Sequence, residues 1–230
     1  MLPLPASAPS VPLSVALTSL PGLIVITATL VALIFRPWEV VLRARAIQNP
    51  WLAAMVILPW VWTLQKLVPV GVPLQLSGAC LIVLMFGWPL AVVTMLPVAA
   101  IAAWLAGEGL GGMVQLAAWN GILPATVALL VGLMTRRFLP QHLFVYILAR
   151  GFITTAVALT ASGSLWFWIT APATTPAMSE LLIGRWLVSW GEAFGTGGLT
   201  AIFVAFRPEW MLTYSDRRYL PGLSQSPRRH

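Results

Sequence analysis

Long apolar segments separated by short polar links are the main pattern along this chain. At 1.5 Å per residue, a helix of about 20 apolar residues crosses the roughly 30 Å hydrocarbon core of a bilayer. The apolar run at 78–106 is too long for one such helix and contains Gly87, Trp88 and Pro89, which favour a turn. The pattern therefore predicts about seven transmembrane helices, at residues 11–35, 51–70, two within 78–106, 113–134, 139–162 and 181–206.

Composition supports the same fold class. Of 230 residues, 59% are hydrophobic and 8% are charged, and the mean hydropathy is +0.89. Soluble domains carry about 25% charged residues, so water is not the solvent of this chain. We expect an all-α polytopic membrane protein, with one compact helical domain at 1–216 and a flexible basic cytoplasmic tail at 217–230.

The positions of the basic residues predict the orientation. If the helices alternate from an outside N-terminus, Lys66 and Arg185 fall outside, and all the arginines of the alternate links fall inside. Positively charged links remain in the cytoplasm, so we expect a multi-pass protein of the inner (cytoplasmic) membrane with its C-terminus inside. The inner set is Arg36, Arg43, Arg45, Arg136, Arg137, Arg207, Arg217, Arg218, Arg228 and Arg229.

Several polar residues lie at membrane depth, where a charge is costly unless it has a partner or lines a cavity. Arg150 and Glu192 are both near the middle of their segments, so a buried pair between them is one expectation. Asn120 is also near mid-depth, and Pro124 has no N–H to donate to the Asn120 carbonyl. Gly191, Gly195 and Gly198 form a stripe of small residues beside Glu192, which predicts close helix packing. The predicted inward face around Arg150 also carries Tyr146 and Thr154.

Two interpretations of these polar residues remain open. They can satisfy one another and hold the bundle together, as polar groups between membrane helices commonly do. Alternatively, they can line a cavity that opens outward and binds a substrate. The candidates for such a substrate site or buried polar centre are Gln75, Asn120, Arg150 and Glu192, with Gln115 further out.

Other classes of function find little support in the sequence. Two histidines and one cysteine are too few for a strong transition-metal site of the usual kind, so the identity of any metal ligand is unknown. No HExxH or GxSxG motif occurs, and we expect the chain not to be an enzyme. The lysine at position 66 is not in a GxxxxGK[ST] motif, so energy for transport must come from partners. The basic residues do not follow one helix face, so no nucleic-acid partner is expected.

Four stretches of the sequence resemble the CbiM-like cobalt and nickel transport family. They are PLQLSG (73–78), FGWPLAV (86–92), AAWNGILPA (117–125) and GEAFGTGGLTAIFVAFRPEW (191–210). Members of this family are the membrane components that capture substrate in energy-coupling-factor ABC transporters. The resemblance implies a cytoplasmic ATPase and a transmembrane coupling subunit as partners. It also implies that Arg207 and Glu209, at the exit of the last helix, are candidates for coupling to them.

The resemblance further implies a metal held near the outer face by the N-terminal amine, a histidine at position two and histidines in the loop before the third segment. Here Leu2 and Gln75 stand in those places, so none of the family's metal ligands can be transferred. We expect a substrate-binding importer component for a cobalt-like or nickel-like ion, which would be its cargo rather than a covalent cofactor. The alternative is an accessory or assembly subunit of a membrane complex that transports nothing.

Overall fold

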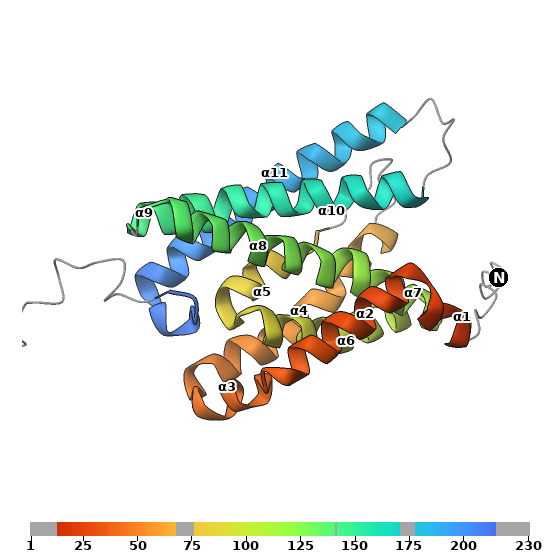
Figure 1. Ribbon diagram of the computed structural model, residues 1–230, viewed down its shortest axis with the longest axis horizontal. Helices are drawn as coiled ribbons and strands as arrows, with labels where there is room; N and C mark the ends of the chain where they lie inside the picture. The colour runs from red at the N-terminus through yellow and green to blue at the C-terminus, as the bar shows by residue number, and fades with distance from the viewer. Residues whose placement is uncertain (1–12, 68–75, 141, 171–177, 215–230) are drawn as a thin grey trace, which may run out of the picture.

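The computed structural model describes residues 13–67, 76–140, 142–170 and 178–214, and every regular element in these ranges is a helix (Figure 1). The predicted tail at 217–230 lies outside them. The first elements are α1 (Leu13–Thr18), α2 (Leu20–Ile34), α3 (Pro37–Arg43) and α4 (Arg45–Leu67). The first predicted segment is therefore two helices rather than one. Ser19 is the N-cap of α2, because its hydroxyl accepts a hydrogen bond from the Gly22 N–H at 3.4 Å.

The prediction of two helices within 78–106 is confirmed. Helix α5 (Ala79–Phe86) has only eight residues, and α6 (Trp88–Leu105) follows after a single linking residue. That residue, Gly87, has φ 78° and ψ 163°, a backbone conformation found almost only in glycine. Pro89 in the first turn of α6 suits its position, because an N–H there would have no partner within the helix.

Replacing Gly87 with alanine tests this link. We expect Gly87→Ala to lower the free energy of unfolding by about 1–3 kcal/mol, because a Cβ makes this backbone region costly. Gly109→Ala is the matched control, since Gly109 has φ −79° and nothing lies within 4 Å of an added Cβ. Thermal unfolding of the purified protein in one detergent measures both. Equal stability of the two variants would contradict the proposed role of Gly87.

Two further long helices each contain a π-helical stretch. The first is α7 (Leu110–Gln115), η1 (Leu116–Ile122) and α8 (Leu123–Phe138), and the second is α9 (Leu143–Val145), η2 (Tyr146–Ile153) and α10 (Thr154–Thr170). The sixth predicted segment ended at residue 162, which is wrong by about two turns. Residues 163–170 remain apolar enough to continue the helix. The chain ends in α11 (Met178–Phe206) and the 3-10 turn η3 (Pro208–Trp210).

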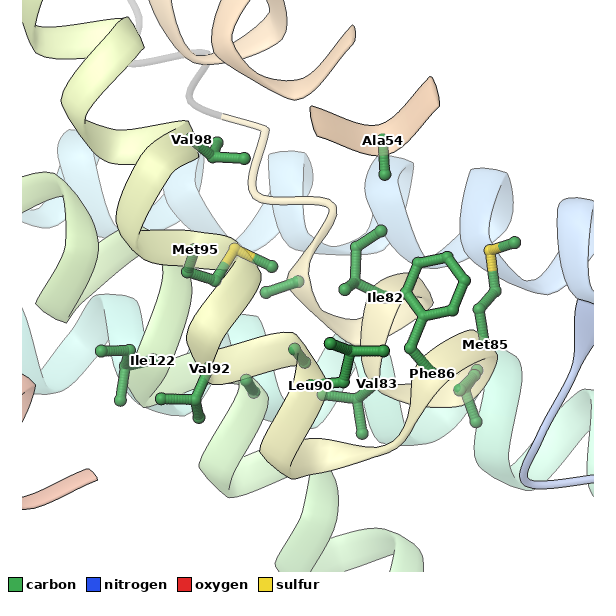
Figure 2. Close-up of a cluster of buried hydrophobic side chains, with 14 of the residues drawn as sticks. Ala54, Ile82, Val83, Met85, Phe86, Leu90, Val92, Met95, Val98 and Ile122 are labelled. Carbon is green, nitrogen blue, oxygen red and sulfur yellow. The ribbon is translucent and has the colours of Figure 1, made fainter. Parts of the chain in front are cut away.

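The core of the bundle surrounds the short helix α5. Figure 2 shows side chains of α5 gathered with those of α6 and with Ile122 of η1. Because seven of the eight residues of α5 are buried, this helix has no polar face. It contacts α4, α6, η1, α8, η2, α10 and α11, so it is the central element of the bundle.

Four arginines gather at one end of the bundle. In Figure 1 the ends of α2, α8 and α11 lie at the left with α3 and α9, whereas α1, α7 and the beginning of α11 lie at the right. The left-hand ends of these helices carry or are directly followed by arginines, which therefore share one end of the bundle. These are Arg36, Arg136, Arg137 and Arg207.

Three described stretches are long and apolar enough to cross a membrane, namely Trp88–Leu105, Leu110–Phe138 and Leu143–Thr170. The number of spans and their orientation stay predictions.

Candidate functional site

Glu192 fixes the chain segment that leads into α5. Its side chain is buried, with 8% of the residue exposed. One carboxylate oxygen accepts the Ser77 N–H and the other accepts the Gly78 N–H, each at 2.7 Å. Charge-assisted bonds of this kind are among the strongest hydrogen bonds in proteins. The middle of α11 is therefore tied to the segment before α5.

Two other helices hold the same segment. The Ser77 hydroxyl donates to the Asn120 carbonyl at 2.5 Å, and the Asn120 amide donates to the Leu76 carbonyl at 3.3 Å. The indole N–H of Trp62 donates to the Ser77 carbonyl at 2.8 Å. We call Trp62, Ser77, Asn120 and Glu192 the polar clamp.

Pro124 explains why the Asn120 carbonyl can accept the bond from Ser77. Pro124 has no N–H, so the α-helical hydrogen bond to the Asn120 carbonyl cannot form. The sequence predicted a free acceptor here, and the bond from Ser77 to this carbonyl confirms it.

The expected pairing of Arg150 with Glu192 is wrong. Both oxygens of Glu192 are bonded to backbone N–H groups, and no ion pair joins these two described residues. Arg150 instead lies over the ring of Tyr146, with its guanidinium carbon 5.4 Å from the ring centroid. It lines a small cavity of about 80 Å³ together with Cys80, Thr154 and other residues. Tyr146 and Thr154 are both buried, so the predicted inward face of this helix is confirmed.

A larger cavity lies beside the polar clamp. It has a volume of about 440 Å³, and Asn120 belongs both to its wall and to the clamp. Gln115, expected further out than Asn120, also lines it, whereas Arg150 and Glu192 do not. The full lining is Glu108, Gly112, Gln115, Leu116, Trp119, Asn120, Trp166, Phe167, Thr170 and Arg185.

Sequence reasoning missed Arg185 as a cavity residue and treated it only as an outer charge. A signal for it existed, because Arg185 lies seven residues before Glu192 and so shares its side of α11. Trp119 was also missed, although it directly precedes Asn120 in the sequence. Gln75 lies outside the described residues.

The glycine stripe does not make the close contact that was expected. Nothing lies within 4 Å of a Cβ added at Gly191, Gly195 or Gly198. Two of the three, Gly191 and Gly195, border an apolar groove of about 600 Å³ between α4, α5 and α11. The close approach of α11 uses Gly197 instead, since its Cα lies 3.4 Å from the Cβ position of Gly151.

The candidate coupling residues lie just beyond α11. Arg207 and Glu209 form an exposed ion pair with an N–O distance of 3.4 Å, and Arg207 also lies over the Trp210 ring. Their role in coupling stays a prediction. Within the described ranges, no group of three or more His, Cys, Asp or Glu side chains is placed to hold a metal ion.

Apolar helices long enough to cross a bilayer, packed around buried polar contacts, define an all-helical membrane protein. The model of one family, CbiM, described as the cobalt uptake substrate-specific transmembrane region, matches residues 13–210. The chain belongs to this family, as the resemblance suggested, and is a membrane component of a cobalt uptake family. No curated protein matches the chain, and no solved structure matches it.

Proposed function

We propose that this chain is the substrate-binding membrane component of an energy-coupling-factor-type ABC importer, with a cobalt-like or nickel-like ion as its cargo. It would be a multi-pass protein of the inner membrane that works with a cytoplasmic ATPase and a transmembrane coupling subunit. Membership of the CbiM family supports a role in cobalt uptake rather than in catalysis.

The observation that carries this proposal is the polar clamp beside a cavity. The family resemblance places substrate ligands in the loop before α5, whose last residues are 73–78. The polar clamp holds residues 76–78 of this loop through side chains and backbone groups of three helices. Since Asn120 contributes to the clamp and to the cavity wall, a substrate in the cavity would contact the structure that fixes the loop. A fixed loop is needed because a metal site requires its ligands in a defined geometry.

Metal binding and uptake test the proposal. We expect the purified protein to bind cobalt or nickel at close to one ion per chain, measured by titration and by mass spectrometry. In vesicles that also contain the ATPase and coupling subunits, we expect cobalt accumulation that depends on ATP. Absence of binding for cobalt, nickel, copper and zinc, both as free ions and as complexes with a small chelator, would contradict the proposal and favour the accessory subunit.

A matched pair of asparagine variants adds a test of the site. Asn120→Ala removes the bond to the Leu76 carbonyl, which is worth about 1 kcal/mol, and we expect cobalt affinity to fall about fivefold. Asn49→Ala, at an exposed residue beside the apolar groove, should leave affinity unchanged. Equal cobalt affinity of the two variants would show that the polar clamp has no role in metal binding.

A further inference from the structure

The 440 Å³ cavity contains a cationic side chain, Arg185, that makes no hydrogen bond with the polar clamp. Glu192 of the clamp attracts Arg185 electrostatically, but both Glu192 oxygens are bonded to backbone N–H groups. Arg185 of α11 lines the cavity and lies against Gly163 of α10. Among the described residues, no hydrogen bond or salt bridge engages its guanidinium. A partly buried guanidinium presents several N–H donors in a plane, a geometry that matches a carboxylate.

Two buried polar atoms on neighbouring residues of the cavity wall also lack partners. The indole N–H of Trp119 and the amide oxygen of Asn120 make no hydrogen bond in the part of the chain that the structure describes. A buried donor or acceptor without a partner costs free energy, which a bound polar ligand can offset. Trp166 and Phe167 add apolar surface to the same wall. The cavity thus combines a cation, a donor, an acceptor and aromatic surface.

This combination fits a small organic anion better than a bare metal ion. A dication would be repelled by Arg185, whereas a carboxylate would be attracted to it. Glu108, the one acidic residue in the lining, already has an interaction partner. The volume also lies within the range of about 300–1,000 Å³ that small-molecule sites occupy.

We propose that this cavity binds a small molecule bearing a carboxylate, with Arg185 holding the carboxylate and Trp119 donating to it. If the proposed function holds, the cargo is a transition metal ion bound by a small carboxylate chelator. The chelator supplies metal ligands that the described part of the chain does not, and the protein recognises the chelator.

Binding of three probes to the full-length protein in detergent tests this proposal. The probes are cobalt(II) chloride alone, citrate alone and a one-to-one cobalt(II)–citrate complex, each titrated by calorimetry. We expect the complex to bind most tightly. In Arg185→Gln its affinity should fall about ten- to a hundredfold, as expected for losing hydrogen bonds from a charged group. Trp119→Phe, which keeps the ring and removes the N–H, should lower affinity a few-fold.

Arg136→Gln is the matched control, because Arg136 is exposed at the end of α8 and does not line the cavity. Cobalt alone binding as tightly as the complex, with no effect of Arg185→Gln, would overturn the carboxylate site and leave the proposed metal function intact. Citrate binding that depends on Arg185, without binding of cobalt in either form, would support the site and overturn the metal cargo. If no probe binds, both are overturned.

Discussion

Glu192→Ala should lower the free energy of unfolding by about 4 kcal/mol. The substitution leaves the N–H groups of Ser77 and Gly78 buried without an acceptor, and each such group costs about 1–3 kcal/mol. For a chain of this length, a loss of that size corresponds to a melting temperature lower by roughly 10 °C. Thermal unfolding in detergent, followed by tryptophan fluorescence, measures it.

Two more substitutions make the result specific to the polar clamp. Glu192→Gln should lose about half as much, because the amide oxygen can accept one N–H while the amide NH₂ group faces the other. Glu180→Ala, at an exposed position in the first turn of the same helix, should change stability by less than about 0.5 kcal/mol. If Arg150→Met restored the stability of Glu192→Ala, the two side chains would form a pair after all, contrary to the geometry of this structure.

The broad architecture follows from the lengths of the apolar runs and from the residues that interrupt them. Gly87 and Pro89 correctly indicated the end of one helix and the beginning of the next. The end of α11 at Phe206 was equally clear, because Arg207 and Pro208 follow it. The break at Ser19 was not foreseen, since the segment on both sides is apolar and a serine hydroxyl can lie inside a membrane helix or cap one.

The buried polar centre was harder to predict than the fold. Position along a helix gives depth in the membrane, and depth correctly selected Asn120 and Glu192 as buried. Depth does not give direction around the bundle axis, so the nearest charged residue at the same depth, Arg150, was a natural but wrong partner. The true partners of Glu192 are backbone N–H groups, which every residue but proline has and which a residue pattern therefore does not reveal.

Gly121→Val should be the second most damaging substitution, lowering the free energy of unfolding by about 3 kcal/mol. A Cβ at Gly121 would lie 3.0 Å from the Cβ of Met95 and 3.1 Å from the Trp62 ring, in a buried region of η1. Adding atoms to a packed core forces side chains out of their preferred rotamers, at about 1–3 kcal/mol. Displacing Trp62 would also weaken its hydrogen bond to the Ser77 carbonyl, so the polar clamp would be disturbed as well.

Gly195→Val on α11 separates this packing effect from the general cost of valine in a helix. It adds the same atoms to a helical glycine, but nothing lies within 4 Å of the new Cβ. We expect it to unfold within a few degrees of the unmodified protein, whereas Gly121→Val should unfold at least about 6 °C lower. The same melting temperature for both would mean that η1 and α4 can move apart without cost. Binding of the cobalt(II)–citrate complex, measured on the folded fraction of Gly121→Val, then shows whether the clamp must be intact for the cavity to hold its ligand.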